Sequence, residues 1–223
     1  MKILLVAATQ AEIDLYCRLS GVTEEHPVVR AGMEISCLIT GVGIAAAAFS
    51  LGRHLALNAY DLIIHAGIAG AIDRKLSIGQ TVFVRSDMFY KLGAEDGENY
   101  LSVFDLGLDN PDEYPFKHGK LFHDFPVFGR DFISTVTSVE AITVQTIHGN
   151  QTSIETLLQT CPEAQIESQE GASVLFAAKM MQMPCIQIRT ISNFVERRNR
   201  DAWNLPLAIE NLNHFLSNLL KPS

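Results

Sequence analysis

Short apolar runs of strand length alternate with helical patterns along most of the chain, and this alternation constrains the fold more than any other feature. Residues 2–8 form one such run before a helical pattern, and residues 34–40 form another before Gly41-Val42-Gly43 and an Ala-rich helix over 44–59. Further strands are expected at 28–31, 61–65, 81–85, 141–147, 164–167 and 185–191, and further helices at 152–160, from residue 170 and at 203–220. The alternation predicts an α/β fold with a mixed, largely parallel central sheet flanked by helices.

The size and charge of the chain restrict its partners. Its 223 residues, 48% of them apolar, suffice for one large core, so we expect a single domain over residues 1–223. The formal net charge of −8 is opposite in sign to the basic field that non-specific nucleic-acid or membrane-surface binding requires. A small-molecule partner is therefore expected, with no nucleic acid and no membrane.

The cysteines and the N-terminus bear on the cellular compartment. Cys17, Cys37, Cys161 and Cys185 are scattered, without a CxxC pair or a histidine at zinc-ligand spacing, so we expect buried, reduced thiols and no metal site. The initial run MKILLVAA is too short for a signal peptide, and no stretch approaches the length of a membrane span. The sequence predicts a cytoplasmic protein.

The region from residue 91 to residue 130 interrupts the alternation with many glycines and prolines. A loop region of this length inside a compact domain is typical of a binding element or a mobile segment. Its phenylalanines favour packing against another surface, such as a neighbouring subunit; they are Phe116, Phe122, Phe125 and Phe128.

Seven residues lie at or just after the ends of predicted strands, where α/β sheets bind their ligands, so one crevice could gather them. They are Glu12, Val42, Ala69, Gly70, Ile147, Glu170 and Asn193. Two carboxylates and an amide suit cleavage of a glycosidic bond, whose transition state carries positive charge on the sugar. Glu12 would activate water, Glu170 would accept hydrogen bonds from ribose hydroxyls, and Asn193 would donate one to the leaving base.

Both carboxylates also have a purely structural explanation. Thr9 to Glu12 matches a capping box, in which the Glu12 side chain reaches back to the backbone N–H of Thr9. Glu170 stands where a strand ends and a helix begins, and an acidic residue there stabilises the helix dipole. The same dipole should keep Glu170 ionised at neutral pH. The convergence of the other strand-end residues is what favours a functional site.

Five motifs in a fixed order carry a resemblance to a known family: AATQAE, TGVGIAAAA, HAGIAGAI, ESQEGA and RTISN. Nearly from end to end, the chain resembles the purine nucleoside phosphorylase and nucleosidase superfamily, particularly its methylthioadenosine nucleosidase branch. YKLGAEDG at residues 90–97 and the stretch at 191–212 are most similar to the futalosine hydrolase family of the alternative menaquinone pathway. The resemblance implies a nucleoside phosphorylase-like fold, hydrolysis of futalosine to hypoxanthine and dehypoxanthine futalosine, a homo-oligomer, and no cofactor.

The resemblance also implies roles for individual residues. Glu12 falls on the water-activating glutamate of the family, and Glu170 on the glutamate that binds the ribose hydroxyls. Asn193 stands where adenine-specific nucleosidases carry an Asp, and an amide donor instead favours the O6 atom of a 6-oxopurine such as hypoxanthine. The positions expected to line the nucleoside pocket are Val42, Ala69, Gly70, Ile147 and Gln169, with Trp203 near an aromatic residue that covers the substrate.

The choice between hydrolysis and phosphorolysis depends on the loop after the first strand. It holds a carboxylate and no cation, which favours hydrolysis, although Arg53, Arg74 and Arg85 could contribute to a phosphate site from elsewhere.

The substrate itself leaves further alternatives open. Gln169 replaces a Met usual in the adenine-specific branch, so the preference of that branch for methylthio substrates does not carry over. Futalosine carries a benzoate, and Arg197 or Arg198 is hypothesised to bind it, although a charge run such as 196–200 is more often a solvated surface. The alternative functions are another purine nucleosidase or phosphorylase, acting on inosine or methylthioadenosine, and a non-catalytic nucleoside-binding protein.

Overall fold

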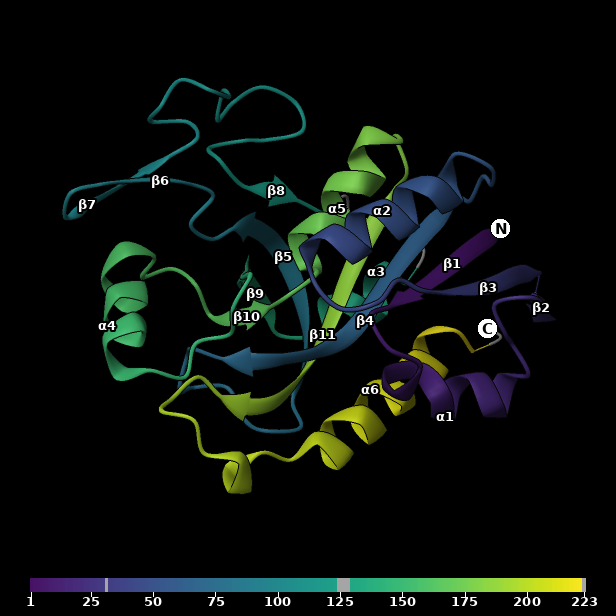
Figure 1. Ribbon diagram of the computed structural model, residues 1–223. Helices are drawn as coiled ribbons and strands as arrows, with labels where there is room; N and C mark the ends of the chain where they lie inside the picture. The colour runs from purple at the N-terminus through teal and green to yellow at the C-terminus, as the bar shows by residue number, and fades with distance from the viewer. Residues whose placement is uncertain (31, 124–128, 222–223) are drawn as a thin grey trace.

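The computed structural model describes residues 1–30, 32–123 and 129–221 (Figure 1). Its strands are β1 (Lys2–Ala7), β2 (Val28–Arg30), β3 (Met33–Ile39), β4 (Leu62–Ala71), β5 (Thr81–Phe89), β6 (Gly93–Asp96), β7 (Asn99–Ser102), β8 (Leu121–Phe122), β9 (Ser138–Thr143), β10 (Ile166–Ser168) and β11 (Cys185–Phe194). Its helices are α1 (Gln10–Ser20), α2 (Ile44–Leu55), α3 (Arg130–Ser134), α4 (Gln151–Thr160), α5 (Gly171–Met180), the short 3₁₀ helix η1 (Arg200–Ala202) and α6 (Leu205–Leu219).

Most strands join one mixed sheet in the order β10-β9-β5-β11-β4-β1-β3-β2, with β8 beside β5, while β6 and β7 form a separate hairpin. The pairings of β1 with β3 and β4, of β11 with β4, and of β9 with β5 and β10 are parallel. Strand β4 also pairs with β10 in the antiparallel direction, so β10, β9, β5, β11 and β4 close into a ring. The predicted mixed, largely parallel sheet is confirmed, whereas the closure of the ring was not predicted.

Helices cover both faces of this sheet: α1 and α6 lie on one face, and α2 and α5 on the other (Figure 1). The side chains of β1 alternate between them. Ile3 and Leu5 pack in the cluster with α1 and α6, whereas Leu4 and Val6 pack in the cluster with α2 and α5. Burial on both faces explains why β1 is a continuous apolar run rather than an alternating one.

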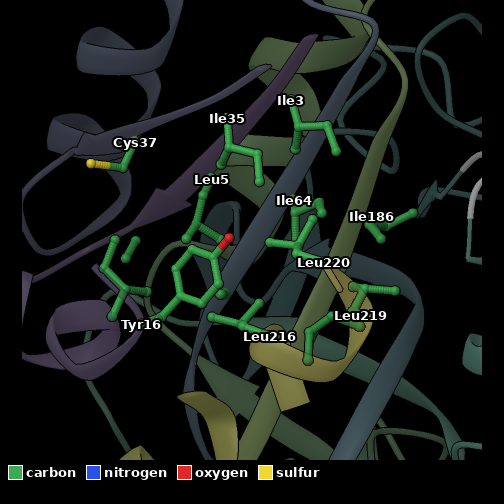
Figure 2. Packing of buried hydrophobic residues seen from close by; sticks show 14 of the residues in the cluster. Ile3, Leu5, Tyr16, Ile35, Cys37, Ile64, Ile186, Leu216, Leu219 and Leu220 are labelled. Carbon is green, nitrogen blue, oxygen red and sulfur yellow. The ribbon is translucent and has the colours of Figure 1, made fainter. Parts of the chain in front are cut away.

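Figure 2 shows the cluster beneath α1 and α6, which joins Tyr16 and Leu216 of the helices to Leu5 and Ile64 of the sheet. Leu216 is fully buried, and truncating such a side chain to Ala costs about 2–5 kcal/mol through lost contacts and a residual cavity. Because α1 begins where β1 ends, this packing holds the first turn of α1 at the edge of the sheet where ligand sites form.

Strand β4 is longer than predicted, and the predicted loop Gly67-Ile68-Ala69-Gly70 is part of it. A Cβ atom on Gly67 would collide with the guanidinium of Arg189, and one on Gly70 would lie 3.3 Å from Asn193 Nδ2. Glycines inside a strand often mark such a close approach. These two therefore leave room for side chains of β11 and do not form a turn.

Three other boundaries also differ from the prediction. Strand β9 lies earlier in the chain than the predicted 141–147. Helix α2 ends at Leu55, before residue 59, and beyond its end the Asn58 side chain donates a hydrogen bond to the His54 carbonyl at 2.9 Å. Strand β11 continues to Phe194, which places Asn193 inside the strand and not after it.

The region 91–130 is largely irregular, as predicted, although it contains β6, β7 and β8. Phe116 packs against Phe176 of α5 with ring centroids 6.0 Å apart, so its contact is within the same chain. Phe122 lies in β8, while Phe125 and Phe128 fall outside the described residues.

The thiols agree with the sequence-based prediction. All four cysteines are buried and free. Within the described ranges, no helix combines the length and the apolar character needed to cross a membrane.

Candidate active site

A cavity of about 270 Å³ opens where β1, β4, β10 and β11 end. Nine of the ten predicted site residues line it: Glu12, Val42, Ala69, Gly70, Ile147, Gln169, Glu170, Asn193 and Trp203. Arg197 is exposed and is not among the described residues that line it. The convergence expected from the strand ends is therefore present in the fold.

Glu12 serves the first turn of α1 and the cavity at the same time. Its Oε2 atom accepts a hydrogen bond from the backbone N–H of Thr9 at 2.9 Å, as the predicted capping box requires. It accepts a second one from Thr9 Oγ1 at 3.1 Å. Its Oε1 atom accepts one from the Ile68 N–H at 3.2 Å. The structural and the functional explanations of Glu12 thus apply to different oxygens of one carboxylate.

Arg189 of β11 is fully buried beside Glu12, and sequence reasoning missed it. Its Nη2 atom lies 3.0 Å from Nε2 of the buried His65, whereas its Nε and Nη1 have no partner among the described residues. Burial, and then the charge of Arg189, lowers the pKa of His65 well below its usual value, so the imidazole is neutral and can accept the bond. Nη1 and Glu12 Oε1 both border the space that a side chain on Gly67 would fill.

Glu170 is the N-cap residue of α5, although its side chain makes no capping bond there. Its Oε1 instead accepts a hydrogen bond from the backbone N–H of Gly43 at 2.8 Å. Burial raises the pKa of Glu170, and the charge of Arg189 and the Gly43 N–H only partly oppose this. Burial therefore acts against the ionised state that the sequence analysis expected for this carboxyl group.

Asn193 lies where the register between β11 and β4 shifts, between Ile191 and Asn193. Irregularities of this kind re-aim side chains near functional sites. Ser192 Oγ donates to Asn193 Oδ1 at 2.8 Å, and Asn193 Nδ2 donates to the Phe194 carbonyl at 3.0 Å. The amide oxygen is thereby tied to the protein, which leaves the second Nδ2 hydrogen as the group available to a ligand.

A smaller recess adjoins the cavity through Gly70, Asn193 and Trp203. Arg198 lines this recess, and its guanidinium lies 5.2 Å from the ring centroid of Trp203. Of the two arginines considered for a substrate carboxylate, Arg198 therefore lies beside the site.

Glu167 and His148 are two further site residues that sequence reasoning missed. Both line the recess, and Glu167 also lines the main cavity. In the sequence, Glu167 is only the last residue of the predicted strand 164–167. A carboxylate at the end of a buried strand was the available signal. No group of three or more His, Cys, Asp or Glu side chains that could hold a metal ion occurs in the described part of the chain.

Comparisons with known proteins assign the chain to a family. The sequence profile of the Phosphorylase superfamily matches residues 2–221. The chain belongs to the phosphorylase superfamily. It is 30% identical to a futalosine hydrolase of Acidothermus cellulolyticus, in an alignment covering 98% of this chain and 90% of that protein. It is also 30% identical to a futalosine hydrolase of Streptomyces coelicolor, over 82% of this chain and 77% of that protein.

Solved structures show the same phosphorylase superfamily fold at lower sequence identity. A methylthioadenosine/S-adenosylhomocysteine nucleosidase of Helicobacter pylori aligns with a TM-score of 0.81 and 16% identity, covering 99% of this chain and 97% of that one. A futalosine hydrolase mutant from Helicobacter pylori aligns with a TM-score of 0.80 and 17% identity, covering 99% and 98% of the two chains.

Proposed function

We propose that this protein hydrolyses the N-glycosidic bond of futalosine and releases hypoxanthine, as a step of menaquinone biosynthesis. The observation that carries the proposal is the convergence of Glu12 Oε1 and the unpaired N–H groups of Arg189 beside Gly67, in the fold that places Glu170 and Asn193 on the same cavity. Both 30%-identical relatives bear the name futalosine hydrolase, which supports this substrate over other purine nucleosides.

Glu12 acts as the general base in this mechanism. Its carboxylate takes a proton from a water molecule while the water oxygen forms a bond to the anomeric carbon of the ribose. Nη1 of the buried Arg189 lies beside the same Gly67, so its positive charge faces the negative charge of Glu12 from within the protein. The electron pair of the broken carbon–nitrogen bond passes to the purine ring, which later takes a proton from solvent.

Glu170 binds the sugar and stabilises its developing positive charge. The Gly43 N–H holds one oxygen of the Glu170 carboxylate, and the remaining acceptor positions of the group can bind ribose hydroxyls. An anion placed before the reaction and largely removed from water stabilises an oxocarbenium-like transition state more strongly than solvent does. Ionised Glu170 is therefore required for turnover.

Asn193 stabilises the leaving base without protonating it, because an amide cannot act as a general acid. Its free Nδ2 hydrogen suits the O6 acceptor of hypoxanthine. Around it, the nucleoside would contact Val42, Ala69, Gly70, Ile147 and Gln169, with Trp203 covering the base.

Hydrolysis fits this site better than phosphorolysis. No Lys or Arg side chain is among the described residues that line the cavity, whereas Glu12, Glu167 and Glu170 are. Two of the arginines that could bind phosphate are engaged elsewhere: Arg74 with Glu196 at 3.1 Å, and Arg85 with Glu140. A phosphate dianion would meet carboxylates where it needs donors.

The proposal extends to a homo-oligomeric, cytoplasmic enzyme. Val42, which precedes α2, and Phe49, which lies within it, are 58% and 69% exposed, and Val42 also borders the cavity. Apolar side chains exposed beside a site favour a subunit contact there. For the benzoate of futalosine, Arg197 and Arg198 remain the proposed partners; an unchanged KM after Ala substitution of each would remove them.

The function is tested by measuring base release from futalosine, inosine and methylthioadenosine, with and without phosphate. We expect phosphate-independent release of hypoxanthine from futalosine, and a fall in kcat of roughly 10²–10⁴-fold in Glu12→Gln. Gln can still complete the capping box, so this variant removes the base and keeps the helix start. Strict phosphate dependence would indicate a phosphorylase. Release of adenine from methylthioadenosine would indicate a methylthioadenosine nucleosidase, and no base release from any of the three substrates would indicate a nucleoside-binding protein.

A further inference from the structure

Glu167 is a buried carboxylate that the mechanism above does not use. It is 4% exposed on β10, between β9 and the end of β4. Its Oε1 accepts a hydrogen bond from the backbone N–H of His148 at 3.0 Å, and its Oε2 lies 2.6 Å from His148 Nδ1. A carboxylate offers about four lone-pair positions, so two acceptor positions remain. A buried carboxylate with unused acceptor capacity at the wall of a cavity is costly unless a ligand completes it.

His148 holds that carboxylate in one orientation. Its ring and its backbone N–H both bond Glu167, and the ring of Tyr90 packs edge-on against it with centroids 5.4 Å apart. Both residues of the pair are nearly inaccessible to water, with side chains 8% and 4% exposed. Because these three contacts hold the pair in place, it cannot rearrange to accommodate a ligand with mismatched hydrogen-bonding groups, and it can therefore discriminate between ligands.

Gly70 brings this pair next to Asn193. A Cβ on Gly70 would meet Asn193 Nδ2 at 3.3 Å and Glu167 Cγ at 3.6 Å, so both side chains lie beside Gly70, and all three residues line the cavity. One presents a fixed donor and the other a fixed acceptor. The ligand that completes both must carry an acceptor beside a donor.

We infer that Glu167, oriented by His148, is the acceptor half of a base-reading pair with Asn193 and selects nucleosides of 6-oxopurines. The inference rests on the proposed function. A 6-oxopurine presents its O6 acceptor beside its N1–H donor, which matches the Asn193 N–H and the Glu167 carboxylate. A 6-aminopurine presents a donor and an unprotonated N1 at the same positions. Both contacts with the protein would then be mismatched, and the N1 lone pair would face an anion.

The test compares kcat/KM for futalosine and for its 6-amino analogue in the same enzyme preparation. In Glu167→Gln, we expect the ratio of futalosine to analogue to fall roughly 10- to 100-fold. Taking a ratio cancels any loss of correctly folded protein. Glu155→Gln, the same change at an exposed position of α4, is the matched control and should leave the ratio unaltered.

His148 is a positioning residue in this proposal, and two variants test it. His148→Leu removes the ring N–H and should lower the ratio in the same direction. His148→Asn can return an N–H close to the original Nδ1 position and should restore most of it. A purely structural pair would lower thermal stability in all these variants without moving the ratio, and that result would overturn the inference.

Equilibrium binding of the free bases separates this inference from the proposed function. Wild-type protein should bind hypoxanthine more tightly than adenine, and Glu167→Gln should lose that preference. If no nucleoside is hydrolysed but this pattern holds, the function fails and the inference stands. If futalosine is hydrolysed but Glu167→Gln leaves both preferences unchanged, the function stands and the inference fails.

Discussion

Two glycines of strand β4, Gly67 and Gly70, each make room for functional groups, but the two groups are built differently. Beside Gly67 lie two opposite charges, Glu12 and Arg189, and the guanidinium keeps donors without partners. Beside Gly70 lie polar groups whose orientation is fixed by neighbours on the protein. Unpartnered charge suits a step in which a proton and a bond move, whereas fixed hydrogen bonds suit recognition. Changes at the first glycine should therefore affect kcat, and changes at the second should affect selectivity.

The largest contrast should come from Gly67→Ala and Gly70→Ala, which make the same chemical change on one strand. The new Cβ at residue 67 would collide with Arg189, so the guanidinium and Glu12 must move apart, and kcat should fall roughly 10²-fold or more. At residue 70 the nearest atom, Val195 Cγ2, is 3.1 Å away and a small adjustment suffices, so KM should change more than kcat. Steady-state kinetics measures kcat and KM for both variants, and circular dichroism checks that both are folded. Equal kcat values would contradict the proposed difference between the two glycines.

Arg189→Gln should lower kcat by roughly 10- to 100-fold, because it removes a buried positive charge and its free donors. It should also change the pH profile. Arg189 opposes the increase that burial causes in the pKa of Glu170, so without it that pKa rises further. Turnover needs the ionised carboxylate, and the acidic limb of the kcat/KM profile should move to higher pH. An unmoved limb would show that Arg189 does not act through the ionisation of Glu170.

Asn193→Asp should act on selectivity with a smaller effect on overall rate. An ionised carboxylate in place of the amide cannot donate to O6, and it repels that oxygen. We expect the preference for futalosine over its 6-amino analogue to drop by roughly 5- to 100-fold. Competition between the two substrates in one reaction measures this directly. A selectivity that survives the change would assign the reading of the base to other residues.

Asp87 provides a buried carboxyl group outside both regions, and it should affect stability rather than activity. It is fully buried, accepts hydrogen bonds from Thr143 and Gln187, and burial raises its pKa to about 6. Between the two pKa values the folded protein holds a proton on Asp87 that the unfolded chain has lost. The stabilisation from this protonation is complete below about pH 3.9 and is lost as pH rises through about 6. In thermal unfolding across this range, the Tm of Asp87→Asn should rise relative to that of the wild type as pH increases. A constant difference would exclude ionisation of Asp87 as the cause.

The sequence predicted those parts of the site that depend on the order of elements along the chain. Glu12, Glu170 and Asn193 could be associated because the carboxyl ends of parallel strands meet at one edge, whatever the exact strand limits. The boundaries of β4 could not be predicted in the same way. Gly67 and Gly70 are typical of a turn, and only their neighbours on β11 explain why they lie in a strand.

Arg189, Glu167 and His148 were missed for a related reason. The role of each depends on a partner distant in sequence: Arg189 on His65 and Gly67, and Glu167 on His148, which lies between β9 and α4. A charged residue within an apolar strand pattern does not reveal whether it faces a core, a solvent surface or a ligand. Sheet pairing decides that, and the closure of β4 onto β10 was not visible in the sequence.

Glu12 has both a structural and a catalytic role, and this affects how inactive relatives should be recognised. Because one oxygen of its carboxylate secures the first turn of α1 at Thr9, a descendant that had stopped turning over nucleosides would still be selected to keep Glu or Gln there for folding. Retention of this glutamate is thus weak evidence that a relative is catalytically active. Burying the charge of Arg189 beside Glu12 costs stability, and Arg189 caps no helix. Loss of this arginine would therefore be the earlier sign of a relative that binds nucleosides without cleaving them.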